Sequence, residues 1–310
     1  MEWEKRLKQS LEYDLGPEII SLLSDPEVIE IMLNPDGKLW VERMGEPMKE
    51  AGFIADFKAE AAIGTLAASL NTTITAQNPV LEGELLIDGS RFEAMIPPVV
   101  AGPTFTIRKK ASKVFSLQEY VEQGIMTQAQ REVIASAVAA RKNILVVGGT
   151  GTGKTTLTNG IIHHIVAVSP GDRIIIIEDT GELQCTAKNS CIMRAVDHCS
   201  MTKLIKATMR MRPDRIIVGE VRDGAALDLL KVWNTGHPGG VATVHANSAP
   251  AGLTRIEHLV REVTQAPMQA FIAEVIDLVV SIEKTPLGRR IREIIEVTSF
   301  DGRNYIFNKI

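Results

Sequence analysis

An eight-residue glycine-rich motif constrains this chain more than any other feature of its sequence. Residues 148–155 read Gly-Gly-Thr-Gly-Thr-Gly-Lys-Thr and match the pattern G-x-x-x-x-G-K-[ST]. They follow an apolar run at 143–147, which predicts a buried strand, and they overlap the start of 154–168, whose pattern predicts a helix. The alternative is a glycine-rich turn that binds nothing, and the full motif between a strand and a helix argues against it.

The chemistry of the motif explains its residue types. Glycines let the backbone curl so that successive N–H groups point at phosphate oxygens, and the helix N-terminus adds the positive end of its dipole. Lys154 is expected to reach the β- and γ-phosphates, and the Thr155 hydroxyl is expected to bind Mg²⁺. The sequence therefore predicts ATP and Mg²⁺ as cofactors, with the phosphates held by Gly148, Gly149, Thr150, Gly151, Thr152, Gly153, Lys154, Thr155 and Thr156.

The composition is that of a folded protein of about two domains. Of the 310 residues, 45% are hydrophobic and 23% are charged, whereas disordered chains combine low hydrophobicity with high net charge. The 34 Lys and Arg residues face 38 Asp and Glu residues, which gives a formal charge of -4. Because no global positive field attracts nucleic acid and only 5% of the residues are aromatic, direct nucleic-acid binding is expected to be weak or absent.

The first residues and the cysteines indicate the compartment. Met1-Glu2-Trp3-Glu4-Lys5 carries acids where a signal peptide needs a basic region, and no apolar run approaches the length of about eighteen residues that spans a membrane. Cys185, Cys191 and Cys199 are too few and too closely grouped for a disulfide framework, and they form no Cys-x-x-Cys pair. We therefore expect a cytoplasmic protein, for which peripheral association with a membrane stays open.

Two regions of different pattern predict two domains. Residues 1–107 mix short apolar runs with turn sequences, which predicts a smaller α+β domain, and residues 108–115 are expected to be a linker rich in basic residues. Residues 116–310 alternate helical patterns with continuous apolar runs, which is typical of an α/β domain with a mostly parallel sheet covered on both faces. The elements expected in the first domain are hairpins of strands 29–33 with 38–42 and 85–87 with 91–96, and a helix over 58–70.

The second domain has the clearer pattern of elements. Capping boxes at Ser116 with Glu119 and at Thr127 with Gln130 mark two helix starts. The other elements expected are strands at 143–147, 173–178, 192–195, 215–219, 241–245 and 278–283, helices at 154–168, 201–210, 224–233 and 268–275, and a hairpin of 290–298 with 304–307.

Two of these strands deliver carboxylates at their carboxyl ends, which is the edge of a parallel sheet where ligands bind. Glu220 follows the strand at 215–219, and Glu178 ends the strand at 173–178. Phosphoryl transfer to water needs an acceptor that orients the attacking water, and Glu220 is the first candidate. Glu178 is the second candidate and could also bind Mg²⁺ through a water molecule. For each, the alternative is a solvated acid that closes a strand.

One histidine and several arginines are candidates for contacts with the transferred phosphoryl group. His245 ends the strand at 241–245, where it could contact the γ-phosphate or sense its loss, and the loop residue His237 has the same option. Cations around the Glu220 strand would stabilise the charge that develops on the phosphoryl group, from the same chain or a neighbouring one. Of Arg210, Arg212, Arg215 and Arg222, two are expected to be functional and two to form surface ion pairs. Arg91 and Arg108 are separate candidates for clamping a nucleotide between the domains.

Four segments in this order resemble the sequence boxes of the secretion traffic ATPases. Residues 148–155 look like the Walker A box, 176–183 like the Asp box, 210–222 like the Walker B box and 236–247 like the His box. The type IV secretion branch is the most similar, since 89–91, 96–99 and 105–109 look like its N-terminal and linker motifs. The four-cysteine module often found in the type II secretion and pilus-extension relatives is missing.

The resemblance implies a Mg²⁺-dependent ATPase built as a homohexameric ring, with N-terminal domains in one layer and RecA-like P-loop ATPase domains in the other. The nucleotide would lie between the two domains of one chain, near a neighbour's arginines. The resemblance also implies a cytoplasmic protein peripherally associated with the inner membrane. Its partners would be the inner-membrane and coupling components of a transfer apparatus, where it would drive pilus assembly or substrate transfer by nucleotide-dependent domain movement.

The resemblance also assigns roles to single residues. It makes Glu178 the Asp-box acid, Glu220 the Walker B acid and His245 the His-box sensor. The choice of catalytic base between Glu178 and Glu220 stays open. The resemblance makes Arg91 and Arg108 nucleotide contacts from the first domain and linker, and Arg210 and Arg222 fall where related ATPases have arginines.

Several other functions stay open at this stage. The runner-up is a pilus-retraction or type II secretion ATPase of the same superfamily. A P-loop small-molecule kinase would need an acceptor pocket or lid, and the four boxes with a separate first domain argue against it. A non-catalytic scaffold would bind nucleotide without hydrolysing it, and a helicase is disfavoured by the net acidity and the few aromatic residues.

Overall fold

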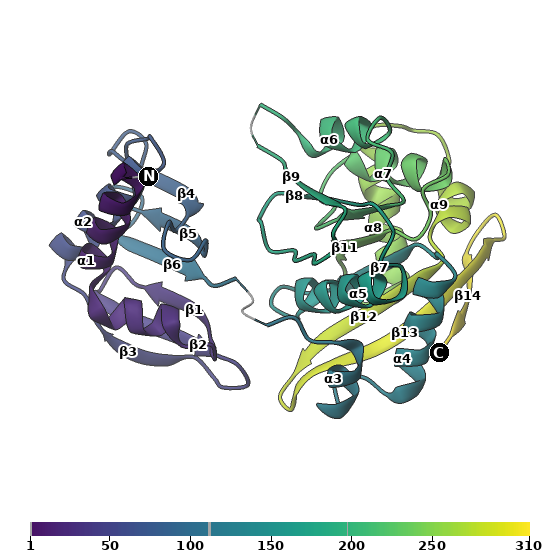
Figure 1. Ribbon diagram of the computed structural model, residues 1–310, viewed down its shortest axis with the longest axis horizontal. Coiled ribbons are helices and arrows are strands. Elements are labelled where there is room, and N and C mark those ends of the chain that lie inside the picture. The colour runs from purple at the N-terminus through teal and green to yellow at the C-terminus, as the bar shows by residue number, and fades with distance from the viewer. Residues whose placement is uncertain (1, 111–112, 197) are drawn as a thin grey trace. The chain divides into compact units, whose positions relative to one another are not determined.

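The computed structural model describes residues 2–110, 113–196 and 198–310 and divides the chain into two compact units, Met1–Ser112 and Lys113–Ile310 (Figure 1). The expected linker at 108–115 starts later than the sequence indicates. Arg108 is the last residue of strand β6 (Thr104–Arg108), and the Lys109 amide still donates to the Ile29 carbonyl at 2.9 Å. Residues 111 and 112 of that linker lie outside the described residues.

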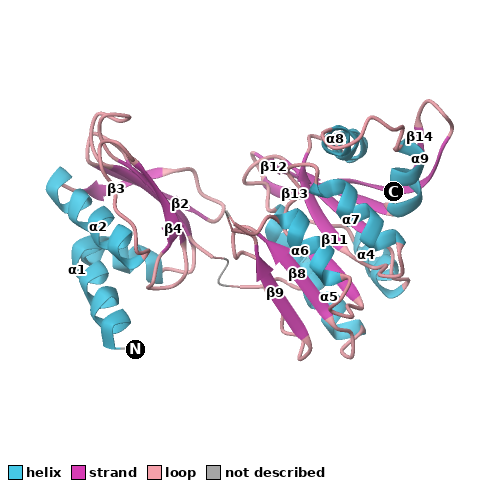
Figure 2. Cartoon of the chain, turned by 90° about the horizontal axis from the view of Figure 1, so that it is seen from above, coloured by secondary structure: helices cyan, strands magenta, loops and turns pink. Residues whose placement is uncertain are grey.

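The first unit is an antiparallel sheet with two helices on one face (Figure 2). Its strands pair in the order β3-β2-β1-β6-β5-β4. Alternate apolar residues point toward the helices and are buried, among them Ile31 and the stacked rings of Phe92 and Phe105, whose centroids lie 5.3 Å apart. In chain order the elements before β6 are α1 (Glu2–Ser24), β1 (Val28–Leu33), β2 (Lys38–Arg43), β3 (Lys49–Phe53), α2 (Asp56–Ser69), β4 (Val80–Glu84) and β5 (Arg91–Met95).

One strand expected in this unit is wrong. Residues 85–87 form no strand, and β5 pairs instead with β4, which ends at Glu84. The reason is the side chain of Asp88, which accepts hydrogen bonds from the Ser90 amide at 2.9 Å and the Ser90 hydroxyl at 2.7 Å. This local turn ties residues 88–90 together and ends the strand pairing before Leu85.

The second unit is built on an eight-stranded sheet in the order β14-β13-β12-β7-β11-β10-β8-β9. The six strands from β12 to β9 run parallel, and β13 and β14 are antiparallel to their neighbours. The fold class is therefore α/β with a mostly parallel sheet, as the sequence predicts. Its elements are α3 (Leu117–Glu122), α4 (Gln128–Ala139), β7 (Ile144–Gly148), α5 (Lys154–Val168), β8 (Ile174–Glu178), β9 (Ser190–Arg194), α6 (Met201–Thr208), β10 (Arg215–Val218), α7 (Ala225–Asn234), β11 (Val241–His245), α8 (Ala249–Arg261), α9 (Gln269–Val275), β12 (Leu278–Thr285), β13 (Gly288–Phe300) and β14 (Tyr305–Lys309).

Helices cover both faces of this sheet (Figures 1 and 2). The four consecutive isoleucines of β8 show why. Ile174 and Ile176 are buried in the cluster that includes α3, α4 and α5, and Ile175 and Ile177 are buried in the opposite cluster with α6, α7, α8 and α9. A strand that is apolar at every position needs a cover on each side, and this arrangement supplies it. In the part of the chain that the structure describes, no helix is long and apolar enough to cross a membrane.

Candidate active site

The phosphate-binding motif lies where the sequence places it, between β7 and α5. β7 ends at Gly148 and α5 begins at Lys154, so the loop and the first turn of the helix share one edge of the sheet. Gly153 has a φ of +97°, a conformation that L side chains rarely adopt. The backbone of this residue sets the entry into the helix, which leaves the amide groups of the first turn without partners inside the helix. Phosphate oxygens are suitable acceptors for those amides.

Lys154 is held inside this loop. Its side chain is buried, and its Nζ donates to the Gly148 carbonyl at 3.1 Å and to the Gly149 carbonyl at 2.9 Å. Nζ also lies 3.2 Å from Nδ1 of His245, which ends the neighbouring strand β11. The ammonium group is therefore fixed between the loop and the next strand end. An incoming phosphate can replace the carbonyl oxygens as the acceptor of its hydrogen bonds.

The contacts continue from His245 to two further residues of the predicted set. His245 Nε2 lies 3.0 Å from Oε1 of Glu220, and the other Glu220 oxygen accepts from Arg222 at 2.9 Å. Arg222 also pairs with Asp179, with 2.7 Å between Nη1 and Oδ2. Lys154, His245, Glu220, Arg222 and Asp179 thus form one chain of polar contacts along the carboxyl ends of β7, β11, β10 and β8.

The charges within this series of polar contacts set the protonation state of Glu220 and His245. Burial alone would raise the pKa of Glu220, but the hydrogen bond from Arg222 and the charges of Arg222, His245 and Lys154 lower it below the ordinary value. Burial and the nearby cations lower the pKa of His245, although Glu220 acts in the opposite direction. Near neutral pH Glu220 is therefore a carboxylate and His245 a neutral ring. The contacts fit the tautomer in which Nδ1 accepts from Lys154 and Nε2–H donates to Glu220.

Glu178 is in a different environment from Glu220. Its side chain is buried, and Oε2 accepts from the amides of Glu182 at 2.7 Å and Leu183 at 3.0 Å. Burial raises the pKa of Glu178 in spite of these hydrogen bonds. The strand end of β10 packs against it so closely that a Cβ at Gly219 would lie 2.9 Å from the Glu178 Cβ, which explains the glycine before Glu220.

The donors near the loop are suited to Mg²⁺. The Thr155 hydroxyl at the first turn of α5 makes no hydrogen bond with a described residue, and Glu178 supplies a buried carboxylate. Both are hard oxygen donors, the class that Mg²⁺ prefers. Within the described residues, three or more His, Cys, Asp or Glu side chains nowhere gather into a metal site.

The arginines around β10 separate into two groups. Arg222 follows the carboxyl end of the strand, in the cluster just described. Arg210 and Arg212 are exposed and lie in the loop that leads into the amino end. β10 has four residues, which span about 13 Å, so this loop belongs to the edge of the sheet opposite the phosphate loop. His237 belongs to that edge too, since its Nδ1 lies 3.0 Å from the Pro213 carbonyl oxygen.

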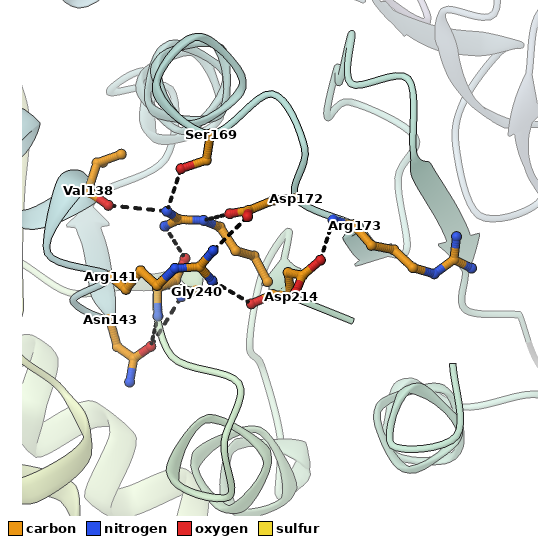
Figure 3. Close-up of polar contacts among 10 residues, drawn as sticks. Val138, Arg141, Asn143, Ser169, Asp172, Arg173, Asp214 and Gly240 are labelled. Carbon is orange, nitrogen blue, oxygen red and sulfur yellow. Dashed lines mark hydrogen bonds and ion pairs between the residues drawn. The ribbon is translucent and has the colours of Figure 1, made fainter. Parts of the chain in front are cut away.

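Arg215 is buried and is neither a surface ion pair nor a site residue. Figure 3 shows part of the polar network around it, with Val138, Ser169 and Asp172 among the labelled residues. Its Nε donates to Asp172 at 2.7 Å, and its other nitrogens donate to the carbonyls of Val138 and Gly239 and to the Ser169 hydroxyl. Asp172 also accepts from Arg141 at 2.5 Å. This network joins α4, the end of α5 and the amino ends of β8, β10 and β11, so the role of Arg215 is to hold the sheet together.

The two candidate arginines of the first unit lie next to each other. Arg91 and Arg108 are directly opposite in the pairing of β5 with β6, so their side chains leave the same face of the sheet. Glu30 is opposite Arg108 on β1, and Glu84 is opposite Arg91 on β4. A contact of either arginine with nucleotide stays a prediction.

Two arginines near the site were not found from the sequence. Arg289 of β13 donates from Nη2 to the Gly151 carbonyl at 3.3 Å, which links the β12–β13 hairpin to the phosphate loop. Arg255 of α8 lines a hollow with Glu220, Val221, Arg222 and His245. Glu220 and His245 were found because they lie at the carboxyl ends of apolar runs. Arg255 and Arg289 do not lie at such positions.

Known proteins of one family match this chain. A family model described as "Type II/IV secretion system protein" matches residues 14–287. A protein of Sinorhizobium fredii named "Probable conjugal transfer protein TrbB" is 53% identical over 300 residues, 97% of this chain and 92% of its own length. The "Type IV secretion system protein VirB11" of Bartonella quintana is 28% identical over 89% of this chain and 90% of its own length.

Solved structures agree with this match. The VirB11 ATPase of the Brucella suis type IV secretion system, crystallised with sulphate, has 25% identity, a TM-score of 0.51, and coverage of 96% of this chain and 97% of its own. The pilus retraction motor PilT with bound ADP shares the fold at 19% identity and a TM-score of 0.61, with 94% and 81% covered. The family model covers most of the residues, and the four sequence boxes lie inside it, so the chain belongs to the type II/IV secretion system protein family.

Proposed function

We propose that this chain is a Mg²⁺-dependent ATPase and the homohexameric motor of a type IV secretion or conjugative transfer apparatus. The observation that carries the hydrolytic activity is the chain of contacts from Lys154 through His245 to Glu220, which joins the phosphate loop to an ionised carboxylate. The role in transfer is supported by two relatives named as conjugal transfer protein TrbB, which are 53% and 50% identical over nearly the whole chain.

In this proposal Glu220 is the general base. It is ionised near neutral pH, and it lies at the strand end beside the phosphate loop, where it can accept a proton from the attacking water. Glu178 is less suited to that role because backbone amides occupy one of its oxygens. His245 lies between Lys154 and Glu220, so displacement of Lys154 toward a phosphate would change the partner of the histidine. His245 thus acts as the sensor of the γ-phosphate.

Thr155, and Glu178 through a water molecule, would hold the magnesium ion. When bound, the ion neutralises charge on the phosphate oxygens. Lys154 and the amides at the start of α5 bind the same oxygens, and Arg222 holds Glu220 in its orientation through their hydrogen bond. The protein's part is therefore to fix the phosphates and the base before the reaction, which is where most catalysis of phosphoryl transfer originates.

Assembly completes the site in this proposal. Because Arg210 lies at the opposite edge of the sheet, it can reach a nucleotide only on another copy of the chain. Arg91 and Arg108 would clamp the nucleotide from the first domain, where two adjacent guanidinium groups suit an anion. The ring would work in the cytoplasm, peripherally at the inner membrane, with the membrane and coupling components of the apparatus as partners.

The Glu220→Gln variant tests the hydrolytic proposal. We expect it to bind ATP but to hydrolyse it about 100-fold more slowly or worse, because the amide cannot accept the water proton. Turnover is measured as ADP formation, and binding with a fluorescent ATP analogue. Glu178→Gln is the matched comparison. Near-normal turnover in Glu220→Gln with a large loss in Glu178→Gln would move the base to Glu178.

Turnover as a function of protein concentration tests the shared site. If a neighbour supplies Arg210, turnover per subunit rises with concentration and then reaches a plateau as the ring assembles. Arg210→Ala should lower the plateau without changing the concentration at which it is reached. A turnover per subunit that is constant down to concentrations at which the chain is monomeric by ultracentrifugation would exclude a residue supplied by a neighbour.

A further inference from the structure

The hollow beside Glu220 has a cation that the hydrolytic mechanism does not use. Its volume is about 310 Å³, and its lining residues are Glu220, Val221, Arg222, His245 and Arg255. Arg255 comes from the second turn of α8, the helix that follows the His245 strand. The buried residues of α8, such as Leu253 and Ile256, pack against the sheet. The half-buried Arg255 therefore reaches the hollow from the flank of the helix.

Arg255 differs from the other cations of the site in its partners. Lys154 donates to two carbonyls, and Arg222 pairs with Glu220 and Asp179. Arg255 makes no hydrogen bond and no ion pair with any residue that the structure describes. It lies near enough to His245 for its charge to contribute, after burial, Lys154 and Arg222, to the lowered pKa of that ring. Arg255 is half buried near other cations, and no described carboxylate lies within ion-pair distance of it, so it is a site for a visiting anion.

The proposed reaction produces an anion next to this position. The oxygen of the attacking water forms a bond to the γ-phosphorus while the bond from that phosphorus to the β–γ bridging oxygen breaks. The bond's electron pair leaves with ADP, and a water proton goes to Glu220. In an in-line displacement the phosphorus moves toward the attacking water, that is, toward Glu220 and away from ADP. The hollow lies on the Glu220 side, so the free phosphate moves toward it.

We propose that Arg255 binds the inorganic phosphate released from ATP, and that the hollow lined by Glu220, Arg222, His245 and Arg255 holds this product before it leaves. The inference rests on the proposed ATPase function. Phosphate fits the hollow because Arg255 offers a planar fork of donors to its oxygens and the protonated Glu220 no longer repels it. A carboxylate of a second copy of the chain would meet the same cation, and the experiment below distinguishes the two.

The test is product inhibition by inorganic phosphate. ATP turnover is followed as ADP formation, at increasing phosphate and at an ionic strength held constant with chloride. We expect Arg255→Gln to raise the inhibition constant of phosphate by about tenfold or more, the value of one charge-assisted hydrogen bond. The KM for ATP should change by less than about twofold, because the nucleotide contacts stay intact. Arg255→Lys should restore part of the inhibition, since it keeps the charge without the fork.

A matched control and a direct measurement complete the design. Arg261→Gln removes an arginine of the same helix whose partner is Glu257, outside the hollow, and it should behave like the unchanged protein. Phosphorus NMR of inorganic phosphate with ADP and protein should show line broadening that Arg255→Gln removes. Suppose that the unchanged protein and Arg255→Gln both hydrolyse ATP normally. Equal inhibition of the two by phosphate, or no inhibition of either, would then overturn the phosphate site but not the ATPase function. A change confined to the assembly state would assign Arg255 to a neighbour's carboxylate instead. An unchanged protein that does not hydrolyse ATP overturns the proposed function as well.

Discussion

Substitution of Lys154 by alanine is expected to reduce ATP turnover by about 1000-fold and to leave the fold intact. The ammonium group is the one cation fixed within the phosphate loop itself, with two loop carbonyls and His245 as partners. A fixed donor at the position where charge develops is worth about 100- to 1000-fold in rate. Its loss also removes the partner of His245, which breaks the connection from the loop to Glu220. The expected loss therefore lies at the upper end of that range.

The measurement is steady-state ADP formation, with circular dichroism melting of the same samples. The fold should persist because the Lys154 side chain is buried within the loop and belongs to neither apolar cluster of the sheet, and the freed carbonyls of Gly148 and Gly149 can bind water. Lys231→Ala, at an exposed position of α7, is the control. Hydrolysis near the normal rate in Lys154→Ala would contradict the assignment of the phosphate loop. A large fall in melting temperature would instead give Lys154 a structural role.

The parts of the site that were predictable follow from one property of parallel sheets. Glu220 and His245 each follow or end an apolar run, and the carboxyl ends of parallel strands meet at one edge, so their proximity to Lys154 could be inferred without coordinates. The direction of β10, once it is known from the structure, also explains which arginines lie near the phosphate loop. Arg210 and Arg222 are only twelve positions apart, but β10 runs between them and carries them to opposite edges.

Other features could not be found because the chain gives no local signal for them. Helix α8 was missed because Pro250 and Gly252, which usually interrupt helices, lie in its first turn. In the structure the proline occupies a position where no intrahelical amide is needed, and Ser248 caps the helix by accepting from the Ala251 amide at 3.2 Å. Arg255 was missed together with this helix. Arg289 contacts a loop more than 130 positions earlier, a distance that no sequence pattern covers.

Arg215 is close to Glu220 in the sequence, but its role in the structure differs from the roles that this closeness suggested. From the sequence it was one of four arginines, with surface ion pairs or phosphate contacts as the options. Its side chain is instead 1% exposed, and its guanidinium has four acceptors from three segments of the chain. Such a group is costly to desolvate, and only a full set of partners stabilises it.

Substitution of Arg215 by methionine is expected to lower the free energy of unfolding of the second unit by about 3–5 kcal/mol, the cost of removing one partner of a buried ion pair. Methionine fills part of the space, but it removes the donor to the Gly239 carbonyl and leaves the Val138 carbonyl with the Arg141 amide and Asp172 with the Arg141 side chain. Urea unfolding followed by tryptophan fluorescence is the measurement. Trp233 is the single tryptophan of this unit, is buried, and donates to the Ile216 carbonyl at 3.0 Å, next to Arg215 on β10.

Arg141→Met provides the matched control, because it removes the other partner of the same carboxylate. The Arg141 side chain is 39% exposed, against 1% for Arg215, so water replaces most of what it loses. We expect a loss of about 1 kcal/mol or less for this variant. Equal losses in the two variants would mean that burial does not decide the strength of these pairs. At temperatures where Arg215→Met is folded, its KM for ATP should be unchanged, because the network belongs to the edge opposite the phosphate loop. A selective rise in that KM would return Arg215 to the nucleotide site.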